Sequence, residues 1–255
     1  MPDPSLTPAK PALPPVHESP VFNGPGRTER FGVVLGIDLG CADSGMVVSR
    51  DVRMPRASYV ITNAARHVIR LAKSGEKIDG LVVWGSEADP TMHPEFREIT
   101  GNLRDLRNKW FSKATLWLAS DNPRVDEAVQ RHAIAVYDKA VVRFDWGTAK
   151  TFSAMTGKKS TEFNNLCAHL GHLENLVLVL RLARGDADNT TDAEIKAWVK
   201  KAAELKPREV HVLNPESKSK KLKPVPKARV TEIAAEITEK VGVPAKIFAA
   251  DTLLG

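Results

Sequence analysis

Residues 79–96 read DGLVVWGSEADPTMHPEF and pass from an apolar run through a polar turn into a stretch with helical spacing. The run at 81–84 is apolar without alternation, which is typical of a strand covered on both faces of a parallel sheet. Phe96 begins a stripe of apolar side chains at helical spacing that ends at Trp110. The segment therefore predicts a strand, a polar loop and a helix, the repeating unit of an α/β fold.

The same alternation continues through most of the chain. Stretches with helical spacing separate the apolar runs, and Thr191 with Glu194 forms a capping box at the start of one of them. Strand–helix–strand units of this kind imply right-handed crossovers and a parallel sheet. A strand count of six or seven fits an open doubly wound sheet or an incomplete (βα) barrel. The apolar runs cover residues 33–37, 81–84, 115–119, 140–142, 175–180 and 209–213, with a weaker one at 245–248.

Composition excludes several classes of protein. The chain has 255 residues, of which 42% are hydrophobic and 27% charged, so it is globular and not disordered throughout. Two cysteines, Cys41 and Cys167, are too few for a disulfide scaffold. No apolar run approaches the roughly 20 residues of a membrane helix, and no apolar signal segment opens the chain. We therefore expect a cytoplasmic protein without membrane contact.

The two ends of the sequence differ from its middle. Eight prolines within the first 25 residues predict a disordered leader over 1–28, with the folded domain at 29–255. The formal net charge is +6, and a lysine run lies near the C-terminus. Such a run is a solvated loop or a phosphate-contacting patch, and RNA is the first partner that it suggests. The lysines are Lys218, Lys220, Lys221 and Lys223.

Polar residues follow nearly every apolar run. In both architectures ligands bind at the carboxyl ends of the parallel strands, so these residues mark the expected ligand face. Polar side chains at strand ends also meet water and cap the next helix, which is the alternative interpretation for each of them. The positions include Asp38 and Cys41, then Ser86, Glu87 and Asp89, then Ser120 and Asp121, and finally Asp145 and Arg181.

Asp38 offers one specific alternative. The sequence around it, GIDLG at 36–40, resembles the first phosphate loop of actin-like ATPases and the first acidic strand of RNase-H-like nucleases. That resemblance implies metal-dependent phosphate binding at Asp38 and antiparallel pairing of residues 33–37 with 46–49.

A longer resemblance covers residues 79–96. The segment is similar to the second-strand region of radical S-adenosylmethionine (radical SAM) proteins, and more narrowly to the tRNA wyosine-synthesis branch, which carries Ser-Gly-x-Gly-Glu-Pro-Thr-Leu-His-Pro. The resemblance implies a partial (βα)6 TIM-like barrel and a cytosolic radical enzyme that modifies tRNA. Further similar segments follow in the same order at residues 142–152, 188–198, 205–210 and 223–225.

The resemblance also implies a 4Fe-4S iron–sulfur cluster, which this sequence lacks the ligands to hold. The family places Cys-x3-Cys-x2-Cys after its first strand, and three thiolates bind three irons while S-adenosylmethionine binds the fourth. Cys41 matches the first cysteine and is the only retained candidate ligand. Gly45 and Val48 stand where the other two are expected, and neither side chain can bind iron.

The implied S-adenosylmethionine pocket is partly kept. Ala88 and Asp89 correspond to the Gly-Glu pair that receives the amino group of S-adenosylmethionine, so a carboxylate remains. Ser86, Glu87, Ser120 and Asp145 are the other candidate cofactor-binding residues.

These observations predict a radical-SAM-like chain that has lost its cluster and acts as a non-catalytic scaffold or regulator, a pseudoenzyme. No catalytic residue is assigned. An active radical SAM enzyme that completes its cluster by another route is the first alternative, and the phosphate-binding domain built on Asp38 is the second.

Overall fold

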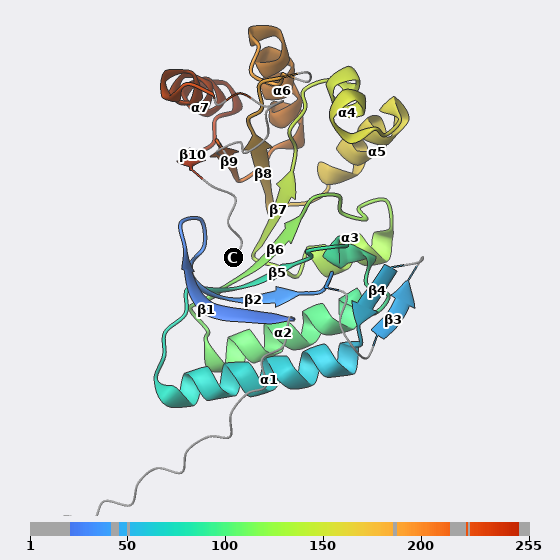
Figure 1. Cartoon of the computed structure of the whole chain (residues 1–255), viewed down its shortest axis with the longest axis vertical. Helices are drawn as coiled ribbons and strands as arrows, with labels where there is room; N and C mark the ends of the chain where they lie inside the picture. Colours follow the sequence, from blue (N-terminus) through green and yellow to red (C-terminus); the bar gives the residue numbers. More distant parts are fainter. Residues whose placement is uncertain are drawn as a thin grey trace, which may run out of the picture.

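The computed structural model describes residues 21–41, 46–49, 52–185, 188–214, 223 and 225–249. Its main feature is a curled, eight-stranded sheet (Figure 1). Within this sheet β1 pairs antiparallel with β2, and all of its other neighbouring strands pair parallel. In spatial order the strands are β1 (Phe22–Thr28), β2 (Gly32–Asp38), β5 (Gly80–Trp84), β6 (Thr115–Ser120), β7 (Lys139–Arg143), β8 (Leu176–Arg181), β9 (Glu209–Leu213) and β10 (Ala245–Phe248).

Helices connect the parallel strands. Because the strand order from β2 to β10 advances in one direction, right-handed crossovers place all of these helices on one face of the sheet. This arrangement is the predicted partial (βα)6 barrel, and the doubly wound alternative, which reverses its strand order, is wrong. The helices are α1 (Ala57–Ser74), η1 (Pro90–Met92), α2 (Phe96–Trp110), α3 (Ala128–Ile134), α4 (Ala149–Thr156), α5 (Ser160–Leu170), α6 (Asp192–Leu205) and α7 (Lys227–Val241).

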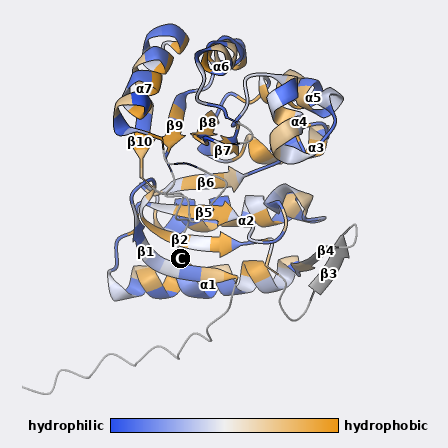
Figure 2. Cartoon of the chain, turned by 45° about the horizontal axis from the view of Figure 1, so that its top comes forward, coloured by the Kyte–Doolittle hydropathy of each residue, from blue (hydrophilic) through white to orange (hydrophobic). Residues whose placement is uncertain are grey.

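Both faces of the sheet are apolar, which explains why the strands read as continuous apolar runs. In β6, Leu116 and Leu118 pack toward the helices, while Trp117 and Ala119 belong to a smaller cluster on the concave face. Figure 2 shows apolar colouring along most strands of the sheet and mixed apolar and polar colouring along the helices. Near the amino ends of the strands, Glu209 binds Lys139 and Lys246 at 2.6 Å each. Charged side chains therefore pair with one another near this end of the sheet.

The start of the folded part differs from the prediction. Residues 22–28, which the proline pattern assigns to the leader, form β1, and Val21 and Phe22 are buried. Proline is tolerated here because β1 is an edge strand and Pro25 falls at the register irregularity between Asn23 and Gly26. Residues 1–20 of the predicted leader lie outside the described part of the chain.

A second difference removes the phosphate-loop alternative built on Asp38. β3 (Met46–Ser49) pairs antiparallel with β4 (Val52–Pro55) and not with β2, which lies between β1 and β5. The antiparallel pairing of 33–37 with 46–49, which that alternative requires, is therefore wrong. α1 follows this hairpin directly.

Within the described residues, no helix combines the length and hydropathy that a membrane span requires.

Candidate functional site

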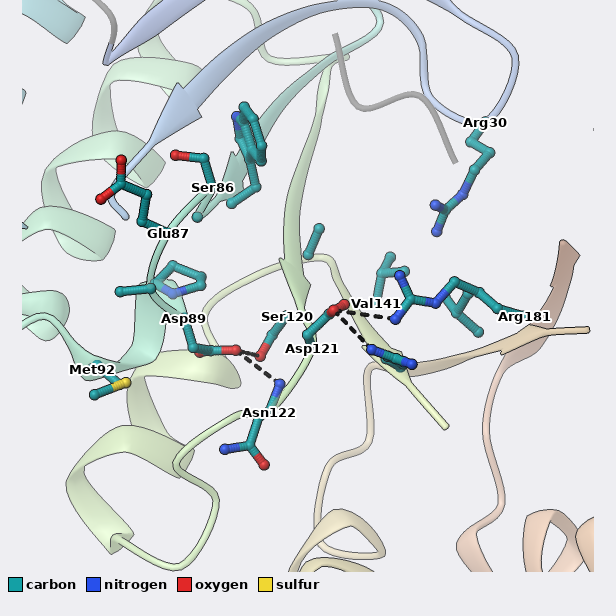
Figure 3. Close-up of a pocket in the computed structure, with 17 residues that line it drawn as sticks. Arg30, Ser86, Glu87, Asp89, Met92, Ser120, Asp121, Asn122, Val141 and Arg181 are labelled. Carbon is teal, nitrogen blue, oxygen red and sulfur yellow. Dashed lines mark hydrogen bonds and ion pairs between the residues drawn. The ribbon is translucent and has the colours of Figure 1, made fainter. Parts of the chain in front are cut away.

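A cavity of about 640 Å³ lies at the carboxyl ends of β5, β6, β7 and β8 (Figure 3). Its position matches the expected ligand face of a parallel sheet, and its size suits a small organic ligand. Of the six residues predicted to bind a cofactor or metal, four line it: Ser86, Glu87, Asp89 and Ser120; the strand-end residues Asp121 and Arg181 line it as well. Of the other two, Asp145 lies behind the wall as a buried carboxylate, and Cys41 is buried and is not among the lining residues.

The Asp89 carboxylate is bound on both oxygens. Oδ1 accepts hydrogen bonds from the backbone N and the hydroxyl of Thr91, at 3.0 and 2.6 Å. Oδ2 accepts from the Ser120 hydroxyl and, at 2.9 Å, from the backbone N of Asn122. A carboxylate has about four acceptor positions, so these donors use its capacity. Asp89 therefore joins the loops after β5 and β6 and caps η1.

The loops after β2 and β5 are in direct backbone contact at the edge of the cavity. A Cβ added to Gly40 would approach Gly85 Cα to 2.7 Å and would overlap the Ala88 carbonyl oxygen. Asp38, which is buried, reinforces this contact, since its Oδ1 accepts from the backbone N of Gly40 and of Ser86, at 2.9 and 3.0 Å. The carboxylate that suggested a metal site thus holds two loops together.

The opposite wall of the cavity is basic. Arg143 and Arg181 end β7 and β8, and the Asp145 carboxylate lies behind both. Its Oδ2 accepts from Arg143 Nε and lies 3.4 Å from Arg181 Nε, and its Oδ1 accepts from the Arg181 backbone N at 2.8 Å. Burial raises the pKa of the Asp145 carboxyl, and the two guanidinium groups oppose this shift. Asp145 therefore orients two cavity arginines.

Arg30 is a cavity residue that the sequence did not reveal. It lies in the turn between β1 and β2, next to the segment that the proline pattern assigns to a disordered leader. Its guanidinium approaches His211 Nδ1 to 3.5 Å and lies over the Phe31 ring. Figure 3 shows Arg30 and Arg181 on the same side of the cavity.

No protein-family model matches the chain, and no curated protein matches it in sequence. Solved structures do match. A radical SAM methyltransferase from Sphaerobacter thermophilus is 14% identical, with a TM-score of 0.57 over 86% of this chain and 67% of that chain. A domain of a pyruvate-formate lyase-activating enzyme from Bacteroides vulgatus is 14% identical, with a TM-score of 0.49 over 67% of this chain and 99% of that chain.

The likeness to the methyltransferase establishes the fold. The chain has the partial-barrel fold of radical SAM proteins, as the order of its strands and the position of its cavity also indicate. The narrower resemblance to the wyosine branch stays a prediction.

The thiols present do not fit the iron–sulfur cluster that this fold implies. The Cys41 thiol is buried and donates to the Asp38 carbonyl oxygen at 3.4 Å. Val48 belongs to β3, where it pairs with Arg53, and Gly45 lies outside the described residues. Cys167 lies on α5, and burial raises the pKa of its thiol to about 11. Among the described residues no group of three or more His, Cys, Asp or Glu side chains could hold a metal ion.

Proposed function

We propose that this chain is a member of the radical SAM superfamily that does not assemble the cluster by itself and acts as a non-catalytic scaffold or regulator. The observation that carries the proposal is the donor set after β2. Three thiolates are required, and the chain offers Cys41 with Gly45 and Val48 at the other two positions. No side-chain chemistry available to glycine or valine replaces a thiolate.

The local fold around these positions supports the same conclusion. The segment that follows Cys41 contains the β3–β4 hairpin. The carbonyl oxygen of Pro55, at the end of that hairpin, lies 2.6 Å from Nε2 of the buried His93. The hairpin is thus fixed to the loop before α2. Val48, the third expected ligand position, is paired with Arg53 in this hairpin, and valine has no atom that binds iron.

The Asp89 contacts give further support. In the family the matching carboxylate receives the amino group of S-adenosylmethionine. Here its acceptor positions are taken by Thr91, Ser120 and Asn122. Binding a cationic amino group at Asp89 would require the release of at least one of these bonds.

Cleavage of S-adenosylmethionine tests the proposal. The purified chain is reconstituted anaerobically with iron and sulfide, reduced, and incubated with S-adenosylmethionine, and the release of methionine and 5′-deoxyadenosine is measured. We expect no release above that of the Cys41→Ala variant. Release that depends on Cys41 would establish the active-enzyme alternative instead.

RNA remains the proposed partner class. The support is the net charge of +6 and the lysine run near the C-terminus. Lys223 is exposed, and its backbone N donates to the Arg184 carbonyl oxygen at 2.8 Å, which holds this end of the run against the loop after β8. The other three lysines of the run lie outside the described residues.

A further inference from the structure

Three arginines converge on the cavity from different parts of the fold. Arg30 comes from the β1–β2 turn, Arg143 from the end of β7 and Arg181 from the end of β8. Arginine carries a planar fork of donors that matches the geometry of phosphate and carboxylate groups. Three such groups beside one cavity indicate an oxyanion ligand.

The two strand-end arginines are held in place from behind. Asp145 is 1% exposed and contacts both guanidinium groups. Its own position is fixed by the Arg181 backbone N, while Asn189 Nδ2 donates to its carbonyl oxygen at 2.8 Å. A single buried carboxylate balances one of the two positive charges.

Asp121 provides the second carboxylate that contacts these arginines. Unlike Asp145, it is exposed and more loosely held. Its side chain is 65% exposed. Its Oδ2 lies 3.4 Å from Arg143 Nη1 and 3.2 Å from Arg181 Nη2. Figure 3 marks the contact between Asp121 and Arg181 with a dashed line. Charge-assisted hydrogen bonds are shorter, near 2.7–2.9 Å, and an exposed pair contributes only about 0.2–1 kcal/mol. Another anion can replace Asp121 at small cost.

We propose that the cavity binds a small organic oxyanion, with its phosphate or carboxylate group between Arg143 and Arg181, and that Asp121 competes for the same two guanidinium groups. The rest of the ligand would lie against the apolar part of the wall. That part includes Trp84, Ala119, Val141 and Val179. The proposal goes beyond the scaffold function and does not depend on it, because anion binding at these arginines requires no cluster.

Removal of the competing carboxylate gives the sharpest test. Inorganic phosphate and malonate are titrated separately into the full-length chain at constant ionic strength, and heat is measured by isothermal calorimetry. Asp121→Asn should bind at least one of them about 3- to 10-fold more tightly than the unaltered chain, a change that corresponds to about 0.7–1.4 kcal/mol. The anion with the larger gain identifies the ligand group as phosphate or carboxylate.

Asp126→Asn is the matched control. Asp126 is also an exposed aspartate, pairs with Arg124 at 3.6 Å, and lies outside the cavity lining. Asp126→Asn removes the same charge as Asp121→Asn but does so outside the cavity, so it should leave the anion affinity unchanged. Arg181→Gln should abolish binding, and circular dichroism checks that this variant is folded. The proposal is overturned if Asp121→Asn binds no more tightly than Asp126→Asn, or if neither anion binds to any variant.

Discussion

The Nε2 atom of His93 lies 2.6 Å from the carbonyl oxygen of Pro55, and this contact joins the end of β4 to the loop before α2. On the other side of the ring, Nδ1 accepts from the backbone N of Glu95 at 3.1 Å. The two contacts require a neutral imidazole with its proton on Nε2. The histidine of the family-like segment is therefore a structural residue that fixes the hairpin.

Replacement of this histidine should destabilise the fold. His93 is fully buried, so His93→Ala leaves the Pro55 carbonyl and the Glu95 N–H without their partner and creates a cavity. We expect a loss of about 2–4 kcal/mol in the free energy of unfolding, measured by urea denaturation. His132→Ala, at an exposed position on α3, should stay within about 0.5 kcal/mol. Equal losses in the two variants would contradict the structural role.

Stability should fall in mild acid. Burial lowers the pKa of His93, as it does for His67 and His211, so the folded state resists protonation. Below about pH 6.5 the unfolded chain then binds more protons than the folded chain, and the free energy of unfolding decreases as the pH falls. Each histidine contributes at most about 1.4 kcal/mol per pH unit.

The measurement compares the free energy of unfolding at pH 7.5 and 5.5 for the unaltered chain and for His93→Gln. The loss between the two pH values should be smaller in the variant, because glutamine does not titrate. An identical pH dependence in both proteins would show that His93 does not contribute.

Replacement of two glycines by alanine should change the stability of the fold in opposite directions. A Cβ on Gly147 would lie 2.6 Å from the Glu194 carbonyl oxygen and would overlap the Trp198 backbone N, so Gly147→Ala should destabilise by about 1–3 kcal/mol. Gly101 lies inside α2 with nothing within 4 Å of an added Cβ. Gly101→Ala should stabilise by about 0.5–1 kcal/mol. Thermal and urea unfolding would measure both, and a neutral Gly147→Ala would contradict the tight contact of its loop with α6.

The RNA proposal predicts a salt-dependent effect of the lysine run. Replacement of Lys218, Lys220, Lys221 and Lys223 by glutamine should weaken RNA binding and reduce the slope of log affinity against log salt by about 0.7 for each phosphate that the run neutralises. Fluorescence anisotropy with single-stranded RNA at several salt concentrations measures both quantities. Replacement of four exposed lysines outside the run, Lys196 and Lys200 on α6 and Lys227 and Lys240 on α7, removes the same charge and provides the control. An equal weakening in both variants would indicate nonspecific attraction.

Most strands of the barrel could be predicted because they are covered on both faces and so appear in the sequence as largely apolar runs, while β10, which is only partly covered, gave the weakest run. The run at 209–213 coincides with β9, and those at 33–37 and 81–84 fall one residue short of β2 and β5 at one or both ends. β1 could not be predicted, because Gly24 and Pro25 break its pattern and its pairing with β2 tolerates an irregularity.

The site could be predicted only in part. The residues at the carboxyl ends of the predicted strands identified the wall of the cavity, because the end of a strand can be located from its own stretch of sequence. The partners of Asp145 and Asp89 depend on which loops lie side by side, and this follows from the order of strands in space. Arg30 was missed because it belongs to the turn after the unrecognised strand.

The iron and sulfide content after anaerobic reconstitution tests the central claim most directly. Cys41 is the only thiol in the segment after β2, so we predict that the gel-filtered chain retains well below four irons and four sulfides and that Cys41→Ser retains the same amount. A stable content near four of each per chain, abolished by Cys41→Ser, would contradict the account.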